Sequence, residues 1–199
     1  MSARQSHVAV VLIDVINTFD FPGSASLIRA AARAAPVIER LLARARKRGV
    51  PVVYVNDNFG RWTSDFEATL EEAVRAERPG RRVCDRLRPV KGDYFVLKPQ
   101  HSGFYATPLD LLLGHLGVHT LVLVGFATNI CVLFTAHDAH MRGYHLVVPR
   151  DACAANSTRL TRAALEHVRV ALGAATPRAD RVDFGSYERR RRKPRGQTF

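Results

Sequence analysis

The chain has 199 residues, of which 47% are hydrophobic and 24% charged, as in an ordinary globular protein with one core. Its three cysteines, Cys84, Cys131 and Cys153, form neither a disulfide framework nor a closely spaced zinc motif. No run approaches the roughly 18 apolar residues of a membrane span, and the N-terminal residues lack a cleavable signal. We therefore expect a soluble, cytoplasmic protein that does not bind membranes.

The net charge of +12 is unevenly distributed along the chain. Residues 186–199 hold six basic side chains and one acid, a net charge of +5 that leaves +7 on residues 1–185. A block of like charges cannot build a core, so we predict one domain over 1–185 and a disordered basic tail over 186–199. The tail is a candidate for weak nucleic-acid contact, but a solvated tail that aids solubility is the favoured interpretation.

Strands and helices alternate along the predicted domain. Apolar, β-branched runs predict strands at 7–13, 51–55, 93–97, 121–124 and 145–148, with a weaker sixth strand within 174–182. Helical spacing of apolar residues predicts helices at about 27–47, 65–75, 108–116, 129–141 and 160–172. The first helix is either kinked at Pro36 or begins there, and residues 78–92 are expected to be irregular. This order predicts a single-domain α/β fold, a doubly wound parallel sheet in three layers.

The stretch 121–137, LVLVGFATNICVLFTAH, predicts a buried strand, a tight turn at Gly125 and the start of a helix. Thr128 or Asn129 is a candidate N-cap, which places Cys131 in the first helical turn. Free N–H groups and the helix dipole there favour a thiolate with a lowered pKa. Cys131 is therefore a candidate nucleophile, and the alternative is a small buried apolar side chain.

Three reactive side chains follow predicted strands. Asp14 follows the first strand, Lys98 the third, and Cys131 the fourth through its turn. The carboxyl ends of parallel strands lie at one edge of a sheet, so we expect an acid, an amine and a thiol to converge on one cleft. The carboxylate can accept the thiol proton, and the ammonium can orient the carboxylate.

With these residues in place, the chain resembles the isochorismatase-like cysteine hydrolases, a family that includes nicotinamidases and N-carbamoylsarcosine amidases. The resemblance spans about residues 8–182 and is carried by VLIDVINTF, VPVVYVND, VLKPQHSGFYATPLDLLL and LVLVGFATNICVLFTAHDAHMRGYHLVVPRDAC. It implies a catalytic triad of Asp14, Lys98 and Cys131. It also implies a cis peptide between Phe126 and Ala127, and an oxyanion hole formed by the N–H groups of Ala127 and Cys131.

The resemblance further implies a small-molecule substrate, an oligomer (homodimer or homotetramer), and substrate contact by Phe19. His101, three residues after Lys98, is a second candidate for substrate contact, and Trp62 is either a pocket wall or a subunit contact.

The chain departs from the family pattern in three places. Ile16 replaces a frequent glutamine, and Asn129 replaces a frequent aspartate. Nicotinamidases carry metal-binding histidines in an Asp-x-His pattern after the second strand, where this chain has Asp57 followed by Phe59. Asp57 alone is a poor metal site, and an aspartate that accepts loop N–H groups is the favoured interpretation. His137 and His140, three residues apart on a helix, fit a solvated surface better than a metal site.

The sequence therefore predicts a metal-independent cysteine amidohydrolase without a cofactor. Its substrate would be a small amide, ureido or carbamoyl compound, cleaved through a thioester with release of ammonia. One alternative is vinyl-ether hydrolysis of the isochorismatase type, which uses Asp14 but no thiol. The other is a binding module whose tail contacts nucleic acid. The arginine-rich stretch 78–92 also leaves an anionic substrate open.

Overall fold

The computed structural model describes residues 6–62 and 65–189, and its centre is β1 (Val8–Ile13), in which all six residues are buried. The other strands are β2 (Val52–Asp57), β3 (Tyr94–Lys98), β4 (Thr120–Phe126), β5 (His145–Val147) and β6 (Cys153–Ala154). The main strands follow the order β3-β2-β1-β4-β5, and the short β6 also pairs with β4. Every one of these pairings is parallel, which confirms the predicted parallel α/β fold.

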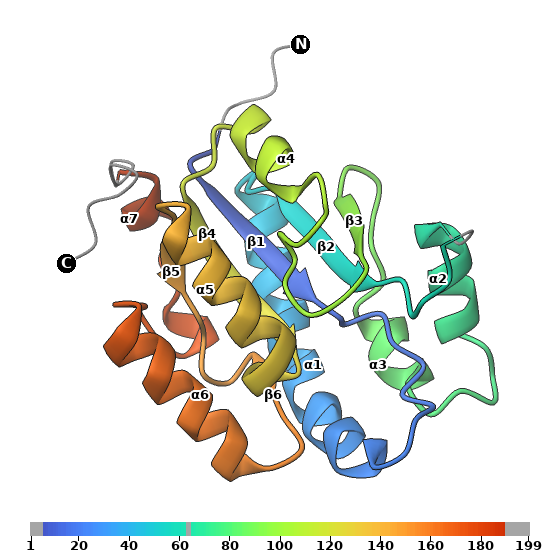
Figure 1. Cartoon of the computed structure of the whole chain (residues 1–199). Coiled ribbons are helices and arrows are strands. Elements are labelled where there is room, and N and C mark those ends of the chain that lie inside the picture. The colour runs from blue at the N-terminus through green and yellow to red at the C-terminus, as the bar shows by residue number, and fades with distance from the viewer. Residues whose placement is uncertain (1–5, 63–64, 190–199) are drawn as a thin grey trace.

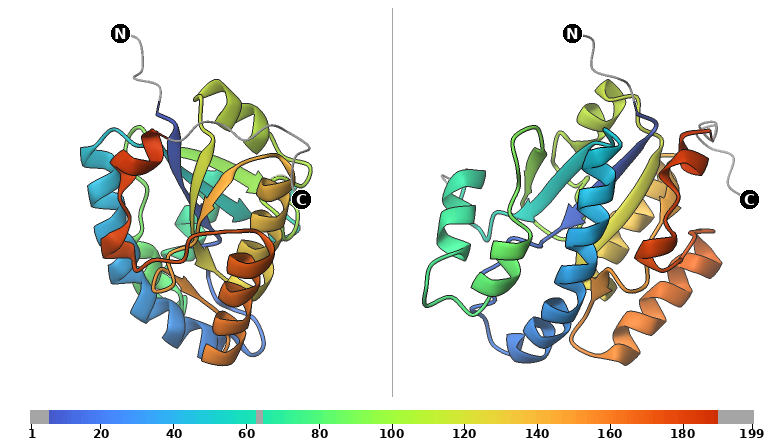
Figure 2. Two further views of the ribbon diagram at one scale, coloured as in Figure 1. Left: turned by 90° about the vertical axis from the view of Figure 1, so that its left-hand side faces the viewer. Right: turned by 180° about the vertical axis from the view of Figure 1, so that it is seen from behind.

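Helices cover both faces of the sheet, so that the fold has three layers (Figure 1). One face packs against α1 (Ser24–Lys47), α2 (Phe66–Ala73), α3 (Arg81–Arg86) and α7 (Phe184–Glu188). The other face packs against α4 (Leu109–His115), α5 (Leu133–Met141) and α6 (Thr158–Ala171). The view from behind in Figure 2 shows α1 lying along the sheet.

Alternate residues of β1 supply these two cores. Val10 and Leu12 belong to the core beneath α1, whereas Val11 and Ile13 belong to the core beneath α5. Side chains of a strand alternate between the faces of its sheet, and both faces are covered here. A central strand that is buried on both faces therefore needs an unbroken run of apolar residues, which β1 has.

The long helix α1 is continuous across Pro36, so it neither begins there nor ends there. Proline removes one backbone hydrogen bond and is unfavourable inside a helix by roughly 3 kcal/mol. Burial of the apolar stripe that includes Ala35, Ile38 and Leu42 against the sheet outweighs this cost.

Two predictions about secondary structure are wrong. Residues 81–86 form the short helix α3, although 78–92 was expected to be irregular, because Val83, Cys84 and Leu87 find a buried place against the core. No strand lies within 174–182: Ala175 forms only an isolated bridge with Val147, and a 3-10 turn, η2, spans Ala179–Arg181. The sixth strand is β6, which is too short to give a sequence pattern.

The chain also stays ordered beyond residue 185, where the tail was predicted to start. Residues 186–188 belong to α7, in which Tyr187 is buried. The Glu188 carboxylate accepts hydrogen bonds from the Ser6 hydroxyl and from the N–H of His7, 2.8 Å away. These contacts hold the helix against the start of β1. The rest of the predicted tail, residues 190–199, lies outside the described residues.

None of the helices in the described ranges is both long enough and apolar enough to cross a membrane.

Candidate active site

Four polar side chains lie where strands of the sheet end. Asp14 directly follows β1, Asp57 is the last residue of β2, and Lys98 is the last residue of β3. Cys131 lies in the turn η1 (Thr128–Val132), just after β4. The strand order reverses between β1 and β4, and ligands of open α/β sheets bind outside the carboxyl ends at such a point.

The Lys98 ammonium is the centre of this group. Its Nζ lies 2.9 Å from Asp14 Oδ2, 3.3 Å from Asp57 Oδ2 and 3.7 Å from Cys131 Sγ. The Lys98 side chain has no exposed surface, so its charge is stabilised by these neighbours and not by water. The acid, the amine and the thiol that the sequence singles out are thus in mutual contact.

Backbone contacts fix the Asp14 carboxylate. Asp14 has a positive φ of 51°, a conformation that aspartate tolerates better than most residues, and its N–H donates to Val55 O at 3.0 Å. The N–H of Asp57 donates to Asp14 Oδ1 at 2.7 Å, which leaves Oδ2 for Lys98. The two oxygens of this carboxylate therefore have different partners.

The turn that carries Cys131 differs from the predicted one. Residues 128–132 form one π-helical turn, in which the N–H of Val132 donates to Ala127 O at 3.3 Å. Neither Thr128 nor Asn129 caps it, and within the described residues Thr128 Oγ1 and Asn129 Oδ1 are buried without a hydrogen-bond partner. The expected side-chain cap is therefore wrong. The peptide bond between Phe126 and Ala127 is cis.

Thr135 links the Cys131 turn to the loop after β3. Its hydroxyl donates to the carbonyl oxygen of Cys131 at 2.7 Å and accepts the N–H of Gly103 at 3.0 Å. Thr135 is fully buried, so both bonds are shielded from water. Sequence reasoning missed this residue. The available signal was its position four residues after Cys131, where a threonine hydroxyl reaches the carbonyl of the preceding turn.

Burial and a neighbouring carboxylate favour the neutral thiol form of Cys131. Burial raises the pKa of Cys131, the negative charge of Asp14 raises it further, and Lys98 offsets only part of this, so that the pKa is about 12. The prediction of a lowered thiol pKa is therefore wrong, because it considered the helix end but not the adjacent carboxylate.

Burial also raises the pKa of Asp14, against the opposing effect of Lys98. For Lys98, burial acts to lower the pKa, but Asp14, Cys131 and Asp57 together outweigh it and the pKa is raised. The lysine is thus cationic, and Asp14 is a stronger base than an ordinary carboxylate.

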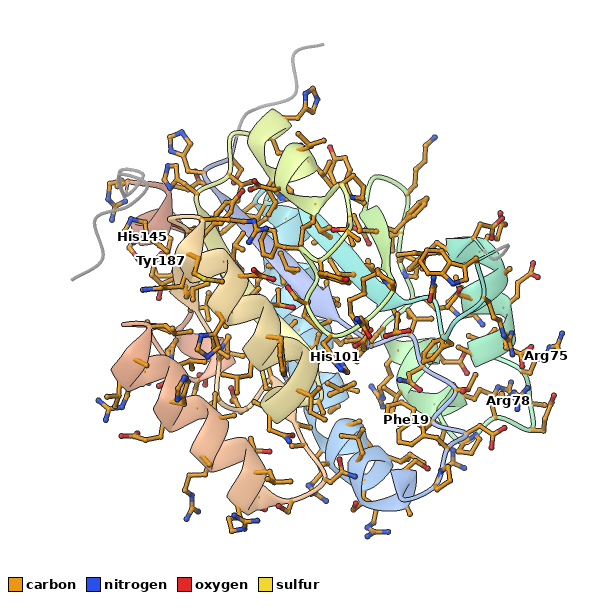
Figure 3. All side chains as sticks on the ribbon, in the orientation of Figure 1. Phe19, Arg75, Arg78, His101, His145 and Tyr187 are labelled. Carbon is orange, nitrogen blue, oxygen red and sulfur yellow. The ribbon has the colours of Figure 1, made fainter. Side chains whose placement is uncertain are left out.

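The three residues predicted to contact substrate occupy different positions. Phe19 is fully buried and packs on Phe126 with ring centroids 6.2 Å apart, which places it against the end of β4 and leaves it no exposed surface for a substrate. His101 is exposed beside the start of α5, 5.4 Å between ring centroids from Phe134 (Figure 3). Trp62 is 78% exposed and makes no described contact with the Lys98 group.

Asp57 does not fit a metal site in this structure. Its Oδ1 accepts the N–H of Phe59 at 2.7 Å, as expected for an aspartate that bonds loop amides, and its Oδ2 faces Lys98. Over residues 6–62 and 65–189, no group of three or more His, Cys, Asp or Glu side chains could hold a metal ion. An ammonium 3.3 Å from the one remaining oxygen disfavours a second cation there.

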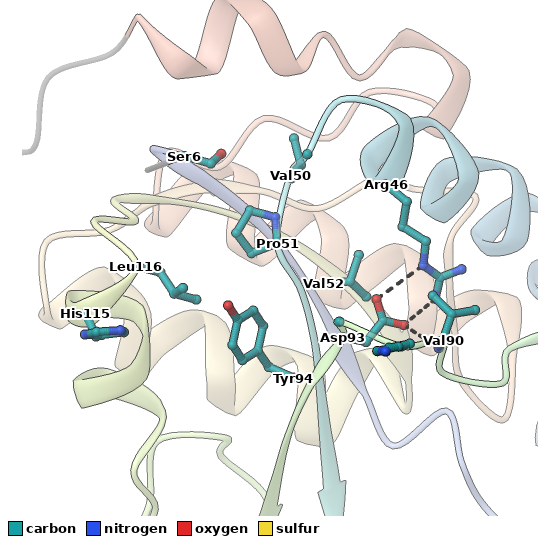
Figure 4. Close-up of a pocket in the computed structure, with 13 residues that line it drawn as sticks. Ser6, Arg46, Val50, Pro51, Val52, Val90, Asp93, Tyr94, His115 and Leu116 are labelled. Atoms are coloured by element: carbon teal, nitrogen blue, oxygen red, sulfur yellow. Dashed lines mark hydrogen bonds and ion pairs between the residues drawn. The ribbon is translucent and has the colours of Figure 1, made fainter. Parts of the chain in front are cut away.

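One pocket of the described structure lies away from these residues. It has a volume of about 640 Å³ and lies at the amino end of the sheet, between Pro51, Tyr94 and His115 (Figure 4). Its arginine, Arg46, already pairs with Asp93 at 2.6 Å. A second pocket, of about 220 Å³, lies between the loops that follow Asp14 and Asp57 and is therefore nearer the strand-end side chains. Arg61 and Arg78 are among its lining residues.

Comparison with known proteins gives a consistent result. The model of the isochorismatase domain family matches residues 8–180. The uncharacterized isochorismatase family protein YaaI of Bacillus subtilis is 40% identical over 149 residues, which cover 75% of this chain and 81% of YaaI. The ureidoacrylate amidohydrolase RutB of Methylobacterium radiotolerans is 32% identical, over 82% of this chain and 74% of RutB.

Among solved structures, the N-carbamoylsarcosine amidase of Thermoplasma acidophilum superposes with a TM-score of 0.69 and 31% identity. The match covers 88% of this chain and 98% of that protein.

Proposed function

The chain belongs to the isochorismatase family of hydrolases, and we propose that it is a cysteine amidohydrolase acting on a small ureido, carbamoyl or amide compound. The observation that carries this proposal is the contact of one buried ammonium, Lys98 Nζ, with both the Asp14 carboxylate and the Cys131 sulfur. Acid-catalysed vinyl-ether hydrolysis would give this sulfur no role, whereas attack on a carbonyl carbon requires it.

In the proposed reaction, Asp14 acts first as a base. It accepts the Cys131 proton while Sγ attacks the carbonyl carbon of the substrate, so the resting thiol becomes nucleophilic only as the carbon–sulfur bond forms. A carboxylate whose pKa is raised by burial is well suited to this exchange, because its affinity for the proton is closer to that of the thiol. Lys98 stays protonated and offsets the negative charge of the carboxylate.

The tetrahedral oxyanion is assigned to the N–H groups of Ala127 and Cys131. In the described residues, the Ala127 N–H donates to no other backbone acceptor, so it is available to a ligand. Asp14 then returns the proton to the leaving nitrogen, the carbon–nitrogen bond breaks, and ammonia leaves a thioester on Cys131. Water adds to the thioester, Asp14 again accepts and returns a proton, and the acid product and the free thiol are regenerated.

The substrate class is supported by the relatives. RutB is named for a ureidoacrylate and the Thermoplasma enzyme for an N-carbamoyl compound, and both names denote cleavage of an amide-type bond. The arrangement of Asp57, which faces Lys98 and accepts the Phe59 N–H, supports a reaction without a metal. We expect a homodimer or homotetramer, which light scattering after size-exclusion chromatography would test.

The decisive experiment measures ammonia release from a panel of ureido, carbamoyl and simple amide compounds. Wild type and Cys131→Ser are compared, and a reaction quenched in acid is examined by intact mass for an acyl adduct on Cys131. We expect release of ammonia and an adduct only with the wild type. Cleavage of the panel at equal rates by Cys131→Ser would contradict the thiol mechanism.

A further inference from the structure

Asp57 contacts both Asp14 and Lys98, although it neither gives nor accepts a proton in the proposed reaction. Its backbone N–H donates to Asp14 Oδ1 at 2.7 Å, and its side-chain Oδ2 lies 3.3 Å from Lys98 Nζ. Asp57 and Lys98 are register partners on adjacent strands, so the pairing is built into the sheet. One residue thus connects the acid that follows β1 with the lysine at the end of β3.

The orientation of the Asp57 carboxylate is fixed from its other side. Oδ1 accepts the N–H of Phe59 at 2.7 Å, which directs Oδ2 toward the ammonium. Lys98 has no exposed surface, and the side chains of Asp14 and Asp57 are 8% and 23% exposed. Two carboxylates therefore share one buried ammonium, and with Cys131 as a thiol this group carries a net charge of −1.

This sharing has a consequence for the strength of the base. If Lys98 paired with Asp14 alone, the full positive charge would stabilise the Asp14 carboxylate and weaken its affinity for a proton. A second carboxylate on the same ammonium takes part of that stabilisation away, and it also disfavours a further negative charge on the Cys131 sulfur. In the described part of the chain, the charged groups that act on one another and on Cys131 here are Asp14 on the β1 side, Asp57 on β2 and Lys98 on β3.

We propose that Asp57 is a positioning residue that holds Lys98 in place and, by sharing its charge, keeps Asp14 basic enough to accept the Cys131 proton. The proposal deepens the proposed function, on which its kinetic part rests. Its electrostatic part concerns Cys131 itself and can be measured without a substrate. Asp57 acts through Asp14 and Lys98 and is not expected to touch the reacting atoms.

The test compares wild type with Asp57→Asn, Asp57→Glu and a surface control, Asp85→Asn. Asp85 pairs with Arg81 and Arg88 on the exposed side of α3, so this control removes the same charge away from the reactive group. The first readout is the pH dependence of iodoacetamide labelling at Cys131, followed by peptide mass spectrometry. The second is the pH profile of kcat/KM for ammonia release.

In Asp57→Asn we expect the labelling pKa of Cys131 and the acidic limb of kcat/KM to move to lower pH, each by about one unit. We expect kcat/KM at neutral pH to fall about tenfold, with Asp57→Glu restoring the wild-type limb and Asp85→Asn leaving both readouts unchanged. An unchanged labelling pKa and limb in Asp57→Asn, with only a lower melting temperature, would overturn the proposal.

Two further outcomes are informative. A loss of wild-type activity on chelation that Asp57→Asn no longer shows would make Asp57 a metal ligand and would also overturn the proposal. If the wild type releases no ammonia from any compound but the labelling pKa still falls in Asp57→Asn, the electrostatic role is supported and the proposed function fails.

Discussion

Gly125 on β4 lies directly opposite Ile13 on β1, so close that a Cβ atom on Gly125 would lie 2.1 Å from the carbonyl oxygen of Ile13. Gly125 also has a φ of +121°, a backbone conformation that residues with a side chain rarely adopt. β1 ends at this contact and β4 ends one residue beyond it, so Asp14 follows Ile13 directly and the Cys131 turn follows shortly after Gly125. The spacing of the base and the nucleophile thus depends on a residue without a side chain.

We predict that Gly125→Ala destabilises the protein by more than about 3 kcal/mol, because the methyl group must push the two buried strands apart. Urea denaturation of the purified variant measures this, and the same variant should have lost ammonia release.

Gly114→Ala is the matched control for this substitution. Gly114 lies in α4 with nothing within 4 Å of a built Cβ atom, so alanine there should stabilise the protein by about 0.5–1 kcal/mol. Equal stability of the two variants would mean that the contact between Gly125 and Ile13 does not constrain the strands.

The main strands were predictable from the sequence because both faces of the sheet are covered, and each strand is therefore an apolar run. The short helix α3 and the two-residue strand β6 were not, for a different reason in each case. In α3, Val83 and Cys84 are buried among four charged neighbours without a longer periodic pattern. In β6, Cys153 pairs with Gly125 of β4, which is distant in the sequence, so the strand is defined by that pairing and not by a local pattern.

The convergence of Asp14, Lys98 and Cys131 followed from strand ends alone, since parallel strands bring their carboxyl ends together. The role of Asp57 did not follow, although it too ends a strand, because its side chain could equally have faced solvent. Its partner is fixed by the register of β2 and β3, which pairs Asp57 with Lys98 and which no local pattern encodes. The π-helical turn at Cys131 was likewise not predictable, because no pattern of residue types distinguishes it from an ordinary first helical turn.

Asp14→Asn and Cys131→Ala should separate the two hydrolytic mechanisms. In the proposed mechanism both groups are needed for the same step, so each variant should lose about 10³-fold or more in kcat/KM for ammonia release. Vinyl-ether hydrolysis would instead survive in Cys131→Ala and fail in Asp14→Asn. Steady-state assays with an amide panel and with a vinyl ether such as isochorismate distinguish these results, and circular dichroism checks that both variants are folded.

The charges of Asp14 and Lys98 should have opposite effects on the pKa of Cys131, and so on its reactivity. Since the Asp14 carboxylate raises the pKa of the thiol and the Lys98 ammonium lowers it, Asp14→Asn should lower the labelling pKa and Lys98→Met should raise it. Labelling with iodoacetamide as a function of pH measures both shifts. Lys91→Met removes an exposed lysine just before β3, at the end of that strand opposite to Lys98, and is the control that should label as the wild type does.

Accessibility should make this labelling selective. Cys84 is fully buried and Cys153 is 6% exposed, and burial raises their pKa values to about 11 and about 12. Only Cys131 is partly exposed, so it should react first in the native protein, and the other two should react only in denaturant. Labelling of Cys84 at the rate of Cys131 in the native state would contradict the described packing.

The contact between α5 and α6 should make the stability of the fold dependent on pH. The Nε2 atoms of His137 and His167 lie 3.0 Å apart, so one ring donates its N–H to the lone pair of the other, a hydrogen bond that needs one neutral acceptor nitrogen. Burial lowers the pKa of His137 from its ordinary 6.5, and His167 and His140 lower it further. The folded state therefore binds this proton more weakly than the unfolded chain does.

The sign of the effect follows from this difference. Above pH 6.5 His137 is neutral in the folded and in the unfolded state, so it does not affect the free energy of unfolding. As the pH falls below 6.5, the unfolded chain takes up the proton first, and the folded state loses stability relative to it. His137→Gln removes this titration, and its melting temperature should fall less than that of the wild type between pH 7.5 and about 5. His115→Gln, at an exposed histidine of α4, is the control and should keep the wild-type slope. Equal slopes in His137→Gln and the wild type would mean that the histidine pair does not couple the two helices to pH.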